Sequence, residues 1–128
     1  MNLLDAVIPA GIEAPRKARR LLQDVLSQLP VEQADDVKLM VNELVTNSVK
    51  HASVEPGAPI RVHIEIEGDA LRGEVFDQGV GFRIRPMARE RPGESGYGLR
   101  LVQGMADRWG LNVRDGTCVW FEVDLAVA

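Results

Sequence analysis

The sequence has little of what several classes of protein require. Cys118 is its only cysteine, so no disulfide can form within the chain and a cytoplasmic location is expected. With two histidines and one cysteine scattered along the chain, a zinc site is not expected. No apolar run approaches the roughly 18 to 20 residues of a membrane-spanning helix, and the N-terminus has no basic segment typical of a secretion signal. The sequence therefore predicts neither secretion nor contact with a membrane.

An excess of basic charge is also missing. The 15 Lys and Arg residues against 19 Asp and Glu residues give a net charge of −4 at pH 7. A protein that mainly grips nucleic-acid phosphates needs a basic field, so direct binding to nucleic acid is not expected. The 128 residues, 45% hydrophobic and 27% charged, are typical of one folded domain spanning residues 1–128.

Helical periodicity predicts two helices in the first half of the chain. They follow a short apolar segment, residues 3–9, whose terminal proline is typical of an edge strand. Apolar side chains then recur at steps of three and four over residues 15–29, and Pro30 ends this first helix. A second helix is predicted from about Val31 to Ala52 by the same spacing.

Alternation of apolar and polar residues predicts strands in the second half. Residues 60–66 alternate at every position, and Gly68-Asp69 turns the chain into a second strand over residues 71–76. Residues 77–98, rich in glycine and arginine, predict a long surface loop of the kind that often serves as a lid. Helical spacing returns over residues 99–109.

Two further strands, over residues 111–113 and 119–127, form a predicted hairpin around Gly116. The full order is a strand, two helices, a hairpin, a glycine-rich loop, a helix and a hairpin. This order predicts an α+β fold in which three helices cover one face of one sheet.

One face of the second predicted helix carries polar side chains that suit a metal-nucleotide site. Glu43, Asn47 and Lys50 are spaced i, i+4 and i+7, so they fall within an arc of about 60°. Carboxylate and amide oxygens offer a general base or ligands for Mg²⁺, which prefers few protein oxygens together with water and phosphate. A solvated helix face with a polar pair is the alternative, and the helix taken alone favours it.

Two glycine-rich segments lie beside predicted secondary structure. Residues 77–81, Asp-Gln-Gly-Val-Gly, directly follow a strand, where an aspartate can accept a hydrogen bond from an exocyclic amine and glycines allow close approach. Residues 96–98, Gly-Tyr-Gly, directly precede a helix, whose first backbone N–H groups attract anions such as phosphate. Each segment alone also fits an ordinary turn.

The order and spacing of these three segments carry a resemblance to a known family. Residues 43–52 resemble the N box of the GHKL ATPases, the superfamily of gyrase, histidine kinases and MutL; residues 77–82 resemble the first glycine box, and residues 96–102 the second. Within that superfamily, residues 106–110 and 117–122 most resemble the bacterial anti-sigma-factor serine/threonine kinases. The resemblance implies a Bergerat-type ATP-binding fold, a two-layer α/β sandwich with a mixed sheet covered on one face by helices.

The resemblance also implies a site for ATP and Mg²⁺. Asn47 would coordinate the Mg²⁺ ion, and Glu43 would orient or deprotonate the attacking hydroxyl. Asp77 would accept the amino group of adenine, with Gly79 and Gly81 allowing close approach. The other cofactor-binding positions that it implies are Lys50, His51, Gly96, Gly98, Leu99 and Thr117. For His51, capping or packing is an equal alternative.

The function implied is that of a protein kinase that binds a sigma factor and phosphorylates an anti-anti-sigma antagonist protein. The catalytic part of a two-component histidine kinase is one alternative, but no histidine precedes His51 to accept the phosphoryl group. A binding module that uses ATP only as a switch is another, disfavoured by the presence of both Glu43 and Asn47. A homodimer formed through the free face of the sheet stays open. Four basic residues could meet an acidic partner or be merely solvated: Arg16, Lys17, Arg19 and Arg20.

Overall fold

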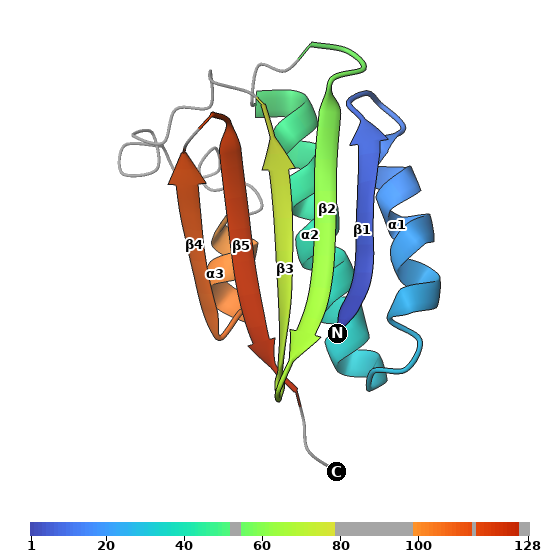
Figure 1. The fold of residues 1–128 in the computed structure, drawn as a ribbon, viewed down its shortest axis with the longest axis vertical. Helices are drawn as coiled ribbons and strands as arrows, with labels where there is room; N and C mark the ends of the chain where they lie inside the picture. Colours follow the sequence, from blue (N-terminus) through green and yellow to red (C-terminus); the bar gives the residue numbers. More distant parts are fainter. Residues whose placement is uncertain (52–54, 79–98, 114, 126–128) are drawn as a thin grey trace.

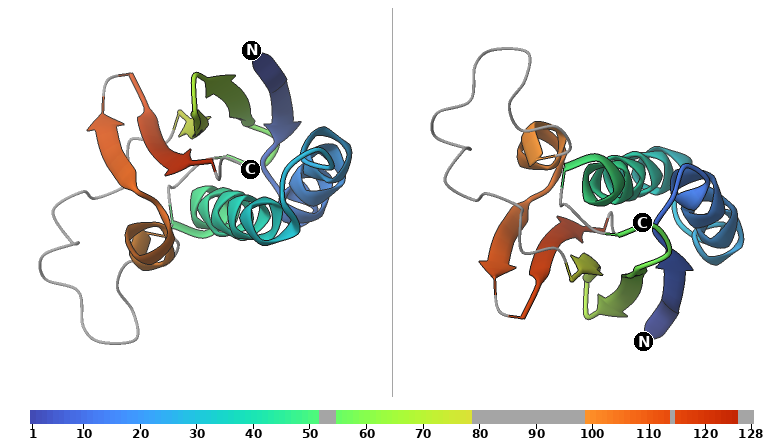
Figure 2. Two further views of the ribbon diagram at one scale, coloured as in Figure 1. Left: turned by 90° about the horizontal axis from the view of Figure 1, so that it is seen from below. Right: turned by 90° about the horizontal axis from the view of Figure 1, so that it is seen from above.

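The computed structural model describes residues 1–51, 55–78, 99–113 and 115–125. These residues form one five-stranded sheet in the order β1-β2-β3-β5-β4, with the helices on one of its faces (Figures 1 and 2). The predicted α+β architecture and the predicted edge position of the first strand are confirmed. The elements are β1 (Asn2–Pro9), α1 (Ala14–Val25), α2 (Val31–His51), β2 (Pro59–Glu67), β3 (Ala70–Asp77), α3 (Leu99–Met105), β4 (Arg108–Val113) and β5 (Thr117–Asp124).

The predicted mixed sheet is wrong, because every pairing between the described strands is antiparallel. Two helices that run in opposite directions, α1 and α2, connect β1 to β2 (Figure 1). The chain therefore returns to the sheet at the end where β1 finished, and β2 runs antiparallel to it. Strands β3 and β4 do run in the same direction, since both are antiparallel to β5, but β5 lies between them.

Two helices end earlier than their apolar spacing predicts. Helix α1 ends at Val25, because the Ser27 amide and hydroxyl both donate to the Asp24 carbonyl, at 3.3 and 2.8 Å. Helix α3 ends at Met105, because the Asp107 amide donates to a carbonyl of β5 at 2.9 Å and β4 begins directly after it. Among the described residues, no helix is long and apolar enough to cross a membrane.

The residues of the central strands β3 and β5 that face the helices position the site. In β3 and β5 every second residue is buried, as expected for strands with one face covered by helices. The Phe121 ring fills the space over Gly73, where an added Cβ would lie 2.4 Å from the ring. The buried rows continue to Asp77, the last residue of β3, and to Thr117, the first of β5. Two polar side chains are thereby turned towards the helical layer at one end of the sheet.

Candidate functional site

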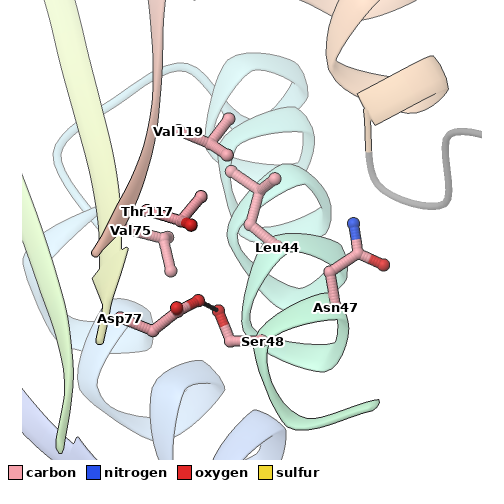
Figure 3. Close-up of a pocket in the computed structure, with 7 residues that line it drawn as sticks. All are labelled: Leu44, Asn47, Ser48, Val75, Asp77, Thr117 and Val119. Carbon is pink, nitrogen blue, oxygen red and sulfur yellow. Dashed lines mark hydrogen bonds between the residues drawn. The ribbon is translucent and has the colours of Figure 1, made fainter. Parts of the chain in front are cut away.

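A pocket lies where α2 faces the paired ends of β3 and β5 (Figure 3). Asp77 and Thr117 are direct partners in the antiparallel register, and each is only 4% exposed. The facing residues of α2 are equally well buried, with Asn47 8% and Ser48 4% exposed. The pocket is lined by Leu44, Asn47, Ser48, Val75, Asp77, Thr117 and Val119. Four buried polar residues thus share the pocket with three apolar residues, which are Leu44, Val75 and Val119.

A short hydrogen bond joins the two sides of the pocket. The Ser48 hydroxyl donates to Asp77 Oδ2 at 2.6 Å, and the bond is buried (Figure 3). Hydroxyl-to-carboxylate bonds of about 2.5 to 2.7 Å are typical of a charge-assisted interaction. The pocket therefore contains a carboxylate that is held by a hydroxyl from the opposite layer.

The turn before β5 brings the backbone of that strand against the end of β3. Gly116 has φ of +137°, and a Cβ added there would lie 2.4 Å from the carbonyl oxygen of Asp77. A side chain at position 116 would therefore push the two strand ends apart. Glycine at this position allows Thr117 to lie directly beside Asp77.

The face of α2 that lines the pocket is set by helical spacing. Residues 44, 47 and 48 lie at i, i+3 and i+4 and so share one side of the helix. Figure 3 shows the Asn47 side chain pointing away from Asp77. Glu43 is half-buried one turn before Asn47, and Lys50 is exposed near the end of the helix; neither lines the pocket.

The structure thus brings together three of the predicted site residues, Asn47, Asp77 and Thr117. Leu99, predicted at the cofactor, is the first residue of α3 and is 3% exposed in the hydrophobic core. The predicted glycine-rich loop lies almost wholly outside the described residues. The predicted positions that cannot be described are Gly79, Gly81, Gly96, Gly98 and the side chain of His51.

Ser48 is a polar residue of the pocket lining to which the sequence motifs assign no role. Its signal was present, because Ser48 continues an apolar helical row one turn after Leu44. A hydroxyl at a buried helix position needs a hydrogen-bond partner from another element. Asp77 is likewise a polar residue at the end of the buried row of β3. Ser48 and Asp77 are therefore suited to form a hydrogen bond with each other.

Several charged residues on the other face of the sheet form ion pairs with one another. Arg72 lies 4.3 Å from the centre of the Trp120 ring and donates to Glu122 at 3.1 Å. The Arg108 Nε also donates to Glu122, at 2.7 Å, and this hydrogen bond lowers the pKa of the Glu122 carboxyl. These ion pairs lie on the face turned away from the helices. Among the described residues that line the pocket, Asp77 is the only one with an ionisable side chain.

Comparisons with known proteins show which family and which relatives the chain is similar to. A family model described as a histidine kinase-like ATPase domain matches residues 8–123. The chain is 32% identical over 115 residues to an anti-sigma F factor of Clostridium acetobutylicum, and the alignment covers 83% of this chain and 80% of the relative. It is 31% identical over 126 residues to a serine-protein kinase RsbW of Listeria innocua, covering 88% and 80%. A serine-protein kinase RsbW of Staphylococcus aureus is 28% identical over 121 residues, covering 83% and 76%.

Proposed function

Because the chain belongs to the histidine kinase-like ATPase domain family, we propose that it binds ATP in the pocket between α2 and the ends of β3 and β5. It then transfers the γ-phosphoryl group to a serine of an anti-anti-sigma protein, and it also binds a sigma factor. The names of the relatives, anti-sigma F factor and serine-protein kinase, support these roles. The observation that carries the proposal is the buried Asp77 carboxylate in a pocket shared with Asn47 and Thr117.

The chemistry of the pocket suits adenine. Asp77 is an acceptor for the exocyclic amino group, and Thr117 beside it adds a hydroxyl that can donate or accept. The apolar side chains of Leu44, Val75 and Val119 suit the faces of a purine ring. A 6-oxopurine would instead set its carbonyl oxygen against the carboxylate, so the pocket favours a 6-aminopurine.

The polar end of α2 suits the phosphates and their metal ion. Asn47 offers a hard amide oxygen, and Mg²⁺ in nucleotide sites is held by few protein oxygens together with phosphates and water. When bound, the ion would neutralise the charge on the phosphates. In the proposal Asn47 is its protein ligand. Lys50 and the glycines at positions 79, 81, 96 and 98 keep their predicted roles around the nucleotide.

Glu43 serves as the general base of the proposed transfer. The serine hydroxyl oxygen of the partner forms a bond to the γ-phosphorus while the bond from that phosphorus to the β,γ-bridging oxygen breaks. ADP leaves, and the hydroxyl proton passes to the Glu43 carboxylate. Glu43 is half-buried and lies one turn, about 6 Å along the helix, before Asn47. In this mechanism the base acts from beside the pocket, and the partner's serine approaches it there.

Replacing Glu43 with glutamine tests this role. We expect Glu43→Gln to bind Mg²⁺ and ATP within about twofold of the unaltered chain, because Glu43 does not line the pocket. Transfer of labelled γ-phosphate to an anti-anti-sigma protein should fall by about 100-fold or more, the usual effect of losing a general base. The measurement is phosphoprotein formed per minute at saturating ATP.

Glu32→Gln is the matched control, because Glu32 is an exposed residue in the first turn of the same helix. It should leave both binding and transfer unchanged. Transfer by Glu43→Gln at the normal rate would show that the assigned base is wrong. If the unaltered chain binds ATP but phosphorylates no antagonist protein, the switch module without phosphoryl transfer becomes the better account.

We place the chain in the cytoplasm, where ATP is available, as one domain spanning residues 1–128. Exposed basic residues on α1 of an acidic chain support contact with an acidic partner surface. These residues are Arg16, Lys17, Arg19 and Arg20. The homodimer considered from the sequence stays a prediction.

A further inference from the structure

Ser48 occupies a position where packing alone requires no hydroxyl. It is 4% exposed and lies one turn after Leu44 on the buried side of α2. Alanine has a higher helix propensity and no polar group to desolvate, so it would serve better if the position only filled space. The hydrogen bond to Asp77 Oδ2, at 2.6 Å, is the specific contribution of the serine.

This bond constrains the part of Asp77 that would meet a ligand. The terminal torsion of an aspartate is broad, so a free carboxylate samples a wide range of orientations. The backbone of Asp77 is fixed by pairing with Thr117 and by the close approach of Gly116 to its carbonyl oxygen. The Ser48 hydroxyl restrains the orientation of the carboxylate itself, by a hydrogen bond to Oδ2 from the opposite layer of the fold.

We infer that Ser48 is a positioning residue that holds the Asp77 carboxylate where it accepts the amino group of a 6-aminopurine, and so sets the selectivity of the pocket for adenine. The inference rests on the proposed nucleotide site. The strength of a hydrogen bond depends on the orientation of its acceptor. Loss of the Ser48 hydroxyl should therefore lower the affinity only for ligands that carry the amino group. A hydroxyl that merely ties α2 to β3 would affect all nucleotides alike.

The test compares three nucleotides on variants of the 128-residue chain. The ligands are ATP, purine riboside triphosphate, which lacks the 6-amino group, and inosine triphosphate, which carries a 6-oxo group, each titrated with Mg²⁺ by calorimetry. The unaltered chain should prefer ATP over purine riboside triphosphate by about tenfold or more, the effect of one hydrogen bond to a charged group. Inosine triphosphate should bind more weakly still.

Ser48→Ala should weaken ATP binding by about five- to tenfold and change the binding of purine riboside triphosphate by less than about twofold. Ser48→Thr keeps the hydroxyl and should restore most of the preference for ATP. Thr46→Ala is the matched control, because the Thr46 hydroxyl donates to the Asn42 carbonyl within α2 at 2.8 Å and lies outside the pocket lining. It should leave the ratio of the two affinities unchanged.

The outcomes separate the inference from the proposed function. Equal weakening of ATP and purine riboside triphosphate by Ser48→Ala would make Ser48 a structural tie and overturn the inference, while the nucleotide site would stand. Equal binding of the two nucleotides by the unaltered chain would also overturn it, because Asp77 would then not read the amino group. Failure of the folded, unaltered chain to bind any of the three would overturn the proposed function together with the inference.

Discussion

Replacing Asn47 with alanine should weaken the Mg²⁺-dependent binding of ATP by about 100-fold or more, equivalent to about 2.7 kcal/mol. Asn47 is 8% exposed and lies on the wall of the pocket, on the polar side of α2. The proposal makes its amide oxygen the protein ligand of the metal ion, and alanine provides no oxygen in its place. Binding measured with Mg²⁺ and with excess chelator should give nearly the same weak affinity for Asn47→Ala, and phosphoryl transfer should be lost.

The matched control for this prediction lies on the same helix. Asn42 accepts a hydrogen bond from Arg19 Nη1 at 3.1 Å, and it does not line the pocket. Asn42→Ala removes the same chemical group from α2 and should leave the dependence on Mg²⁺ unchanged. If Asn47→Ala kept a strong dependence on Mg²⁺, the metal ligand would have to be another residue.

Replacing Asp77 with asparagine is the second large effect that we expect. The change is nearly isosteric, but it replaces one carboxylate oxygen with an NH₂ group that can only donate. The amide oxygen that remains is an uncharged and weaker acceptor, and the NH₂ group sets donor against donor where it faces the amino group of adenine, so ATP affinity should fall by about 100-fold. The bond from Ser48 would also lose its charge assistance.

Selectivity distinguishes this result from a general loss of structure. Asp77→Asn should remove the preference for ATP over purine riboside triphosphate, while circular dichroism shows a folded protein. Asp69 lies in the exposed turn between β2 and β3, and Asp69→Asn is the matched control. It should change neither the affinity for ATP nor the preference for ATP over purine riboside triphosphate. Full ATP affinity in Asp77→Asn would place the adenine outside this pocket.

Local patterns in the sequence predicted which elements form and in what order. Alternation over residues 60–66 and helical spacing over residues 31–52 each reflect one buried face, which a single segment reveals by itself. The end of α3 was predicted wrongly because Met105 and Ala106 continue a helical spacing that pairing of β4 with β5 interrupts. The antiparallel direction of all the described pairings likewise depends on contacts between distant segments, which periodicity does not contain.

The site residues that belong to a sequence motif could be predicted, whereas those whose role depends on a contact between two distant elements could not. The resemblance to the N box and the first glycine box pointed to Asn47 and Asp77, and the structure places both in one pocket. The roles of Ser48 and Gly116 depend on their proximity to Asp77, from which both are distant in the sequence. Helical spacing groups Glu43 with Asn47 on one polar face of α2, whereas the pocket is lined by Asn47 together with Leu44 and Ser48 and not by Glu43.

The most direct test of the account is calorimetric titration of ATP into the folded 128-residue chain, once with Mg²⁺ and once with excess chelator. We expect saturable binding at one site with Mg²⁺, and binding at least about tenfold weaker without it, because the phosphates then lack their counter-ion. Absence of ATP binding by protein that circular dichroism shows to be folded, or affinity that does not change when Mg²⁺ is removed, would contradict the proposed site.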